Sequence, residues 1–475
     1  MGRLLEAGKT TSVCLDAAYN SYMHPSYAFR LTNRSRRGKI LNSRVSHWIE
    51  VCGGAAVGHK QPTGGINPLT MRLLDIWVGK PLCAFLTLAR TLARLIGLER
   101  VYTQPPHRIL FIKLIEQGAT VLAYDAVRRA QELVGRENVY FCVLQSNREI
   151  LDLMGLIPPE NVLAIRSESL LLFFIDTIRT LRRARLLSID AVIDMEFFSR
   201  APAVLAYLTG AKYRVGIHRF TAELPYRGDL MTHRVSYNPY LPVATAYRML
   251  VETLMLNPSD KPLPKLSPIC VTEPPPQFVP TREEQESVYQ MLDSAAHREV
   301  RKPIVILNPN ASDIIPLRKW PTERFIELGN RLVQSRPDIN IVITGSPAEA
   351  VAGKEIAHAI GEDHAVSVAG LTTLRELVVL YTLADVMITN DSGPAHFACL
   401  TDIDIVVLFG PETPMLYGPL GDHAHVIWAG LACSPCVSAF NHRLSPCRDN
   451  VCMRAITVEQ VYTKTMELLE RRKDG

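Results

Sequence analysis

The segment from Thr389 to His396 reads Thr-Asn-Asp-Ser-Gly-Pro-Ala-His and combines residue types that can bind an anion. It follows the apolar run Ala384 to Ile388, which is typical of a buried strand, and it opens a predicted helix. The first turn of a helix has backbone N–H groups without partners and carries the positive end of the helix dipole. The segment therefore predicts a phosphate site at a strand-to-helix turn.

Three residues of this segment suit a phosphate site for different reasons. Gly393 allows a ligand to approach the backbone, and Pro394 fits a first helical position because it has no N–H to leave unpaired. His396 lies within one turn of the same helix end. An ordinary capped helix, with Asp391 or Ser392 as the N-cap, is the alternative, since capping residues are common at helix starts.

Two runs of alternating strand and helix patterns would position this segment. Strands are predicted in the first run at 109–114, 139–144, 162–165 and 191–196, and in the second at 304–307, 341–344, 384–388 and 405–409. Helices are predicted in the first run from about 120 to 133 and near 148–154, among others. Such alternation implies an α/β fold with parallel, doubly wound sheets. Ligands on these sheets bind at the carboxyl ends of strands, which puts Glu116, Asp194 and Glu196 toward one crevice.

The chain divides into four predicted parts. Residues 1–70 show no periodicity and are expected to be disordered, and Met71 is hypothesised to be the true start. Residues 71–100 form an amphipathic helical segment. Residues 101–280 form the first doubly wound domain and end in a linker with eight prolines, and residues 281–475 form the second.

Composition limits the classes of protein. The chain has 475 residues, 47% of them hydrophobic, and a formal net charge of +5, which fits a multidomain globular protein and does not indicate nucleic-acid binding. Neither a cleavable signal peptide nor a P-loop is visible, and no Gly-x-Gly-x-x-Gly follows the first strand. The apolar stretch 77–98 contains Lys80, Arg90 and Arg94, so we predict an interfacial amphipathic helix, with a buried core helix as the alternative.

Four motifs in this order resemble glycosyltransferase family 9, the ADP-heptose:lipopolysaccharide heptosyltransferase family. They are Ile109 to Lys113 with the turn at Gly118, Arg318-Lys319-Trp320-Pro321, Thr389 to His396, and Phe409 to Pro414. The resemblance covers roughly residues 105–470. It implies a GT-B fold, in which two Rossmann-like domains face an interdomain cleft, the first taking the acceptor and the second the nucleotide-sugar.

The resemblance also implies site residues and chemistry. It implies inverting transfer without a required metal, acting on a lipopolysaccharide core or another glycan or lipid-linked acceptor. The expected setting is the cytoplasmic face of a bacterial inner membrane, with peripheral contact to anionic lipid. The donor-binding residues implied by the match are Ser312, Arg318, Lys319, Glu349, Asp391, Ser392, Gly393, Pro394 and His396.

The sequence departs from the family at the catalytic base. The family carries an Asp directly after the Gly of the first turn, and this chain has Ala119 there. The acceptor hydroxyl still needs a group to take its proton, and we predict Glu116, with Glu196 as the second candidate. Without either, the protein would be a catalytically silent nucleotide-sugar binder. The sequence is also compatible with a GT-B-like epimerase or a membrane scaffold.

Two groups of residues have spacings that could bind a metal ion, one made of four cysteines and one of two aspartates. Cys433, Cys436, Cys447 and Cys452 cluster as in some family members, which predicts a structural zinc site or disulfides. The pattern Asp402-Ile403-Asp404 has metal-binding spacing, but it precedes a strand at the end away from the ligand side. We therefore predict that this pair lies in a solvated loop.

Overall fold

The computed structural model describes residues 68–99, 104–220, 225–259, 265, 269, 274–311, 315–438, 440–441, 443 and 445–474. The predicted disorder of residues 1–70 and the hypothesis of a start at Met71 therefore fall almost entirely outside the described residues. The exception is Pro68 to Thr70, which are helical rather than irregular because they begin the helix α3, Pro68–Trp77.

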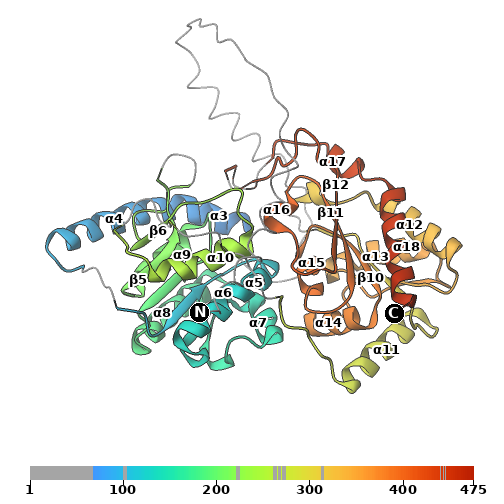
Figure 1. The fold of residues 1–475 in the computed structure, drawn as a ribbon, viewed down its shortest axis with the longest axis horizontal. Helices are drawn as coiled ribbons and strands as arrows, with labels where there is room; N and C mark the ends of the chain where they lie inside the picture. The colour runs from blue at the N-terminus through green and yellow to red at the C-terminus, as the bar shows by residue number, and fades with distance from the viewer. Residues whose placement is uncertain are drawn as a thin grey trace, which may run out of the picture. The chain divides into compact units, whose positions relative to one another are not determined.

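The first half is built on a parallel six-stranded sheet in the order β3-β2-β1-β4-β5-β6 (Figure 1). Its strands are β1 Ile109–Ile112, β2 Val139–Leu144, β3 Val162–Ile165, β4 Ala191–Asp194, β5 Tyr213–Ile217 and β6 His233–Val235. Its helices are α3, α4 Gly79–Leu95, α5 Gln117–Leu122, α6 Tyr124–Val134, α7 Arg148–Met154, α8 Leu170–Leu186, α9 Arg200–Leu208 and α10 Val243–Glu252.

The second half repeats this plan, with a parallel sheet in the order β12-β11-β10-β7-β8-β9. Its strands are β7 Ile304–Asn308, β8 Asn340–Ile343, β9 Ala365–Ser367, β10 Val386–Asn390, β11 Asp404–Phe409 and β12 Ala424–Trp428. Its helices are α11 Arg282–Ala296, α12 Thr322–Ser335, α13 Ala350–Ile360, α14 Leu374–Leu383, α15 Gly393–Ala398, α16 Pro414–Tyr417, α17 Val451–Arg454 and α18 Val458–Asp474.

The inner strands are almost completely buried and mostly apolar because helices cover both faces of each sheet (Figure 1). In β1, Ile109 and Phe111 face one core cluster while Leu110 and Ile112 face another, and all four are fully buried. Both sheets are the doubly wound arrangement predicted from the sequence. In the first sheet the strand order reverses between β1 and β4, and in the second sheet it reverses between β7 and β10. Ligands bind at such switch points, outside the carboxyl ends.

The sequence-based elements agree best where strands are long and apolar. The helix 148–154 and the strand 162–165 match the structure at both ends. The single helix expected from Thr120 to Leu133 is two helices, because α5 ends at Leu122 and α6 begins at Tyr124. The edge strands β6, β9 and β12 were not predicted, since the first two have three residues each and β12 is only partly buried.

Helices α3 and α4 precede the first sheet and are amphipathic. Cys83 and Leu86 of α4 are buried in the core beneath it, and Arg90 donates to Glu99 and Asp229. Thr70–Leu95 is one helical stretch long and apolar enough to cross a membrane by length and composition, yet only 17% of its most apolar window is buried. The alternative of a buried core helix is therefore wrong.

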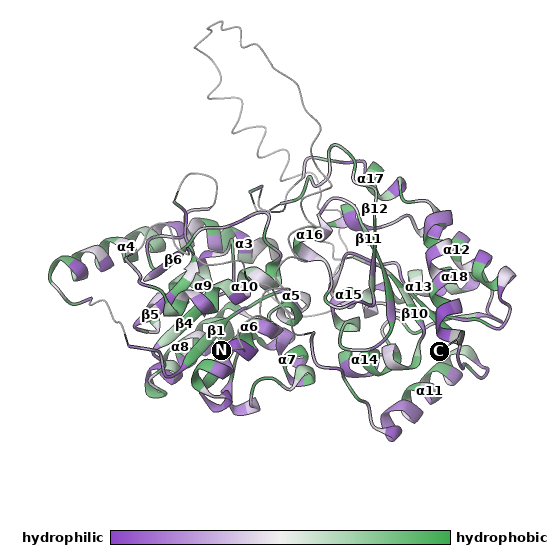
Figure 2. Ribbon diagram, viewed as in Figure 1, coloured by the Kyte–Doolittle hydropathy of each residue, from purple (hydrophilic) through white to green (hydrophobic). Residues whose placement is uncertain are grey.

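Helices α3 and α4 carry both hydrophobic and hydrophilic residues along their length (Figure 2), and many of the hydrophobic ones are exposed. The cations Arg72, Lys80 and Arg94 are exposed on the same helices. The exposed apolar side chains are Leu73, Leu74, Trp77, Val78, Leu82, Phe85, Leu88, Leu92 and Leu95. This composition is the one expected of a helix that lies in a membrane interface.

The prediction that Asp404 lies in a solvated loop is wrong. Asp404 is the first residue of β11, and its carboxylate is buried with 1% exposure. Arg471 and Arg472 of α18 contact it at 2.5 and 2.7 Å, and His425 of β12 contacts it at 3.2 Å. The side chain thus anchors the C-terminal helix to the sheet, whereas Asp402 is exposed as predicted.

We predict that Asp404→Asn destabilises the protein by about 3 kcal/mol, because it leaves two arginines without their carboxylate. Burial raises the pKa of Asp404, but donation from Arg472, His425 and Arg471 outweighs it and holds the pKa below its usual value. The folded pKa is thus depressed, so this stability is present at neutral pH and is lost as pH falls below about 4.

Urea unfolding at several pH values measures this effect. Asp402→Asn is the matched control and should change the free energy of unfolding by less than about 0.5 kcal/mol. Equal unfolding curves for the two variants would contradict the anchoring role of Asp404.

Candidate active site

The loop after β1 carries two charged residues that face each other. Lys113 is almost fully buried, and its Nζ lies 3.2 Å from Glu116 Oε2 and 3.1 Å from Glu196 Oε2. Burial alone would lower the pKa of Lys113, but the two carboxylates raise it, so the ammonium is charged. Glu116 itself is more than one third exposed and has a left-handed backbone, with φ of 69°. Non-glycine residues held in this region are often functional.

Glu196 contacts this loop through both of its carboxylate oxygens. Its Oε1 accepts the backbone N–H groups of Leu114 and Ile115 at 3.0 and 3.2 Å, and its Oε2 pairs with Lys113. Both oxygens are thus in use within the protein, and the residue is buried. The geometry makes Glu196 a positioning residue for the Glu116 loop, while its assignment as a base stays a prediction.

The loop after β10 is fixed by Asn390. This buried side chain accepts the backbone N–H of Trp320 at 3.0 Å and donates to the carbonyl of Pro309 at 3.0 Å. It thereby joins the end of β10 to the motif that carries Arg318. Arg318 Nη1 lies 3.5 Å from Asp391 Oδ2, so the structure brings these two predicted residues together.

Glu412 follows β11 and extends the same charge cluster. Its carboxylate is 2% exposed, and Oε2 lies 3.6 Å from Arg318 Nη1. Burial raises the pKa of Glu412 to about 7, although the positive charges of Arg443 and Arg318 oppose that rise. At neutral pH the carboxyl can therefore carry a proton and donate a hydrogen bond, or lose it and accept one.

Arg443 completes the cluster from the segment between β12 and α17. It forms an ion pair with Glu116 Oε1, and its Nε lies 3.6 Å from Glu412 Oε1. Burial alone would raise the pKa of Glu116. The positive charges of Arg443 and Lys113 outweigh this effect, Arg443 more than Lys113, and lower the pKa to about 2. Both ion pairs therefore favour the ionised form of this carboxyl group.

Polar atoms without partners concentrate in this cluster. Among the described residues, seven buried side-chain N or O atoms have no hydrogen-bond partner. Four of the seven are Arg318 Nε, His396 Nδ1, Glu412 Oε1 and Arg443 Nε. Because buried polar groups are rarely left unpaired, this concentration indicates a polar, charged ligand that these atoms would contact.

The first turns of α5 and α15 lie against each other beside the cluster. A Cβ at Gly118 would lie 2.6 Å from His396 Cδ2 and 3.4 Å from Gly393 Cα, so only glycine fits there. Burial lowers the pKa of His396, and the imidazole is therefore neutral at pH 7. Ser392, Gly393 and Pro394 begin α15 as the sequence predicted, and Asp391 precedes them.

The remaining predicted donor residues are Ser312, Glu349 and Lys319. Ser312 lies outside the described residues. Glu349 follows β8, where its Oε2 accepts the N–H and Oγ–H of Ser346 in a capping box. Lys319 follows Arg318, and its carbonyl accepts Asn450 Nδ2 at 2.9 Å. The donor-binding roles that the family resemblance implied for these three residues therefore stay predictions.

Sequence reasoning missed Glu412 and Arg443. Glu412 follows an apolar strand at its carboxyl end, which is the signal that identified Asp194 and Glu196, so the same rule could have found it. Arg443 lies in an irregular segment without periodicity, and its contact with Glu116 joins residues 327 positions apart. No local pattern predicts such a contact.

The cysteines of the predicted zinc site follow β12, and the last of them, Cys452, lies in α17. Their thiols are free, with Cys452 buried and Cys433 and Cys447 exposed. Burial raises the pKa of Cys452. In the described part of the chain no three His, Cys, Asp or Glu side chains are grouped to hold a metal. The zinc site therefore stays a prediction.

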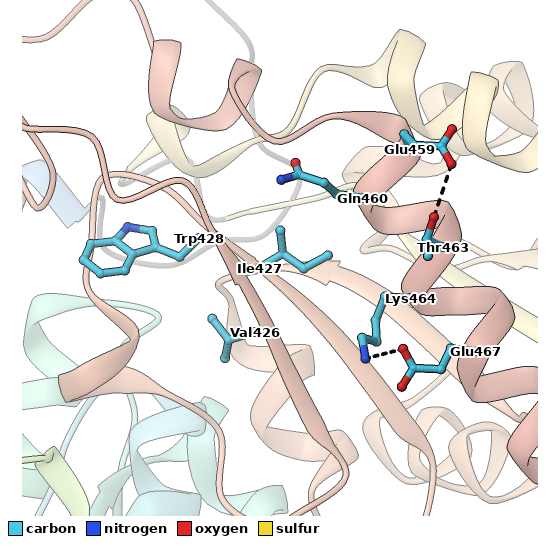
Figure 3. Close-up of a pocket in the computed structure, with 8 residues that line it drawn as sticks. All are labelled: Val426, Ile427, Trp428, Glu459, Gln460, Thr463, Lys464 and Glu467. Carbon is cyan, nitrogen blue, oxygen red and sulfur yellow. Dashed lines mark hydrogen bonds and ion pairs between the residues drawn. The ribbon is translucent and has the colours of Figure 1, made fainter. Parts of the chain in front are cut away.

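A separate groove lies between β12 and α18 (Figure 3). Its polar side chains pair with each other, since Thr463 donates to Glu459 at 3.2 Å and Lys464 contacts Glu467 at 2.5 Å. None of the described buried atoms without a partner belongs to a residue of this groove. The charge cluster at the strand ends is therefore the better candidate for the active site.

Comparison with known proteins identifies the family of the chain. Residues 177–444 match the family described as Glycosyltransferase family 9 (heptosyltransferase). Lipopolysaccharide heptosyltransferase 2 of Salmonella typhimurium is 29% identical over 157 residues, covering 32% of this chain and 44% of that protein. The alignments with the first curated relatives span less than half of their length.

Two solved structures share the fold. E. coli ADP-heptose lps heptosyltransferase II is 21% identical, with a TM-score of 0.58 over 77% of this chain and 99% of that one. E. coli heptosyltransferase WaaC with ADP is 17% identical, with a TM-score of 0.52 over 76% of this chain and 99% of that one. These similarities confirm the predicted GT-B fold.

We predict that Glu196→Gln destabilises the protein by about 3 kcal/mol, because the amide cannot neutralise the buried Lys113. Urea unfolding provides the measurement. Glu132→Gln, which removes an exposed carboxylate that pairs with Arg129, is the control and should cost less than about 1 kcal/mol. A Glu196→Gln variant as stable as the wild type would show that this carboxylate does not support the loop.

Proposed function

Because the chain belongs to glycosyltransferase family 9, we propose that it is an inverting glycosyltransferase that uses a nucleotide-diphosphate sugar. The acceptor in this proposal is a lipopolysaccharide core or another surface glycan, and heptose is the first candidate for the sugar. The names of similar proteins, heptosyltransferases that act in lipopolysaccharide or lipooligosaccharide synthesis, motivate this choice. The ADP bound to one structural relative makes ADP the first candidate for the nucleotide.

The observation that carries the proposal is the partly unpaired charge cluster at the ends of β10 and β11. Arg318 faces Asp391 and Glu412 at 3.5 and 3.6 Å, and its Nε has no partner. A diphosphate would satisfy these guanidinium N–H groups with charge-assisted hydrogen bonds. Asp391 would then accept hydrogen bonds from hydroxyl groups of the donor, and a protonated Glu412 would donate to a hydroxyl or phosphate oxygen.

Chemistry at this site would consist of one displacement. The acceptor oxygen forms a bond to the anomeric carbon while the bond to the diphosphate oxygen breaks, and the electron pair leaves with the diphosphate. Attack from the side opposite the leaving group inverts the anomeric carbon. Arg318 and Lys319 would offset the charge that develops on the diphosphate, a contribution of about 3 kcal/mol for one well-placed donor.

Glu116 would take the proton of the acceptor hydroxyl. It lies at the carboxyl end of β1, next to the first turn of α5, which touches α15 of the donor side. Its carboxylate is ionised and more than one third exposed, so an acceptor hydroxyl can reach it. No metal is required in this scheme, because the arginine and lysine side chains supply the positive charge.

One observation favours a second candidate function. The ion pairs with Arg443 and Lys113 hold the pKa of Glu116 far below neutrality, and a carboxylate with so low a pKa is a weak general base. Together with Ala119, where the family resemblance leads us to expect Asp, this arrangement would suit a nucleotide-sugar binder that does not transfer.

A membrane-bound acceptor would agree with the exposed face of α3 and α4. Its apolar side chains and the cations Arg72, Lys80 and Arg94 suit an interface that contains anionic lipid. We propose that the protein lies in peripheral contact with the inner membrane on its cytoplasmic side, the setting that the family resemblance implies.

We expect Asp391→Ala and His396→Ala to weaken the binding of ADP-sugars at least tenfold in calorimetry, because both residues lie at the turn where the sugar of the donor would bind. Glu116→Gln should lower transfer at saturating donor by at least 100-fold while it does not weaken ADP binding. UDP and GDP, together with their sugars, complete the panel.

Equal transfer by Glu116→Gln and the wild type would remove this base assignment. Binding of ADP without any sugar transfer, in the wild type and in Glu116→Gln alike, would support the silent binder. If none of the nucleotides bound, the proposed donor site itself would be wrong.

A further inference from the structure

Arg443 is the residue that joins the donor side of the site to the candidate base. Its guanidinium pairs with Glu116 through Nη1, lies 3.6 Å from Glu412 through Nε, and lies over the ring of Tyr417, 5.1 Å from its centre. Arg318 contacts the opposite oxygen of Glu412. The two arginines therefore flank the same carboxyl group, and only one of them also touches the base.

The pairing of Arg443 is incomplete. Its Nε is buried and has no hydrogen-bond partner, and the same is true of Glu412 Oε1, which it faces at 3.6 Å. A guanidinium has five N–H donors and can bind a phosphate through two of them at once. At least one N–H group of Arg443, on Nε, is therefore available to a ligand that binds beside Glu412.

Arg443 also holds Glu116 in an ion pair. The charged and titratable groups that face Glu116 are Lys113, Glu196, Tyr247, His396, Glu412, Tyr417 and Arg443. Arg443 is the larger of the two cationic influences on this carboxylate, the other being Lys113. An ion-paired carboxylate must give up this pairing in order to accept a proton, which reduces its strength as a base.

We propose that Arg443 is an exchangeable counter-ion, which pairs with Glu116 in the free protein and with the donor's diphosphate in the complex. The dianionic diphosphate competes for the guanidinium because it offers more charge and accepts two parallel hydrogen bonds. Once Arg443 has moved, Glu116 is free to accept the acceptor's proton. The base would then become active only after the donor has bound. This inference rests on the proposed glycosyltransferase function.

Calorimetry with ADP on a double-mutant cycle tests the exchange. Arg443→Met should weaken ADP binding at least tenfold and leave the binding of adenosine, which lacks phosphate, unchanged. Arg448→Met is the matched control, because it removes an exposed arginine of the same segment, and it should bind ADP within twofold of the wild type. Glu116→Gln should tighten ADP binding at least threefold, since Arg443 no longer has a partner to leave.

The fourth variant decides between exchange and simple repulsion. In the Arg443→Met background, Glu116→Gln should change ADP affinity by less than twofold, because there is no guanidinium to release. A gain of the same size in both backgrounds would mean that Glu116 merely repels the diphosphate, and would overturn the exchange. So would weaker ADP binding by Glu116→Gln, a result that misfolding of Arg443→Met cannot mimic.

The outcomes separate this inference from the proposed function. Suppose that the wild type binds ADP, that Arg318→Met does not, and that Arg443→Met binds ADP as the wild type does. The proposed donor site would then stand, and the exchange would be wrong. If the wild type binds no ADP, both fail.

Discussion

Buried charge that is only partly paired is the constraint on which the rest of this structure depends. Arg318 and Arg443 approach Glu412 at 3.6 Å each, which is too long for a strong hydrogen bond, and three of their polar atoms have no partner. Desolvating such groups is costly unless something binds them. These partly paired groups lie near the switch points of the two sheets, where α/β proteins bind their ligands.

The surrounding elements hold these charges in place. Asn390 ties the end of β10 to the segment that carries Arg318, and Glu196 ties Lys113 to the loop that carries Glu116. Both supporting side chains are buried and have their hydrogen bonds satisfied, whereas Nε of Arg318, which Asn390 helps to position, has no partner. This division between satisfied supports and unsatisfied site atoms is the pattern expected of a preorganised binding site.

Sequence alone predicted the two doubly wound sheets, because inner parallel strands are apolar on both faces and their carboxyl ends carry polar residues. It therefore located Asp391 and Glu116 at strand ends. It placed Asp404 in solvent, because its contacts with Arg471 and Arg472 come from a helix more than sixty residues away. Arg443 escaped prediction for the same reason, since its partner belongs to the other sheet's loops.

The central claim is that the cluster between Arg318 and Arg443 binds the diphosphate of a nucleotide-sugar. A crystal structure of the protein with ADP tests it most directly. The account predicts the β-phosphate within hydrogen-bond distance of both guanidinium groups, beside Asp391 at the carboxyl end of β10. ADP bound in the groove between β12 and α18, or phosphates that contact neither arginine, would contradict it.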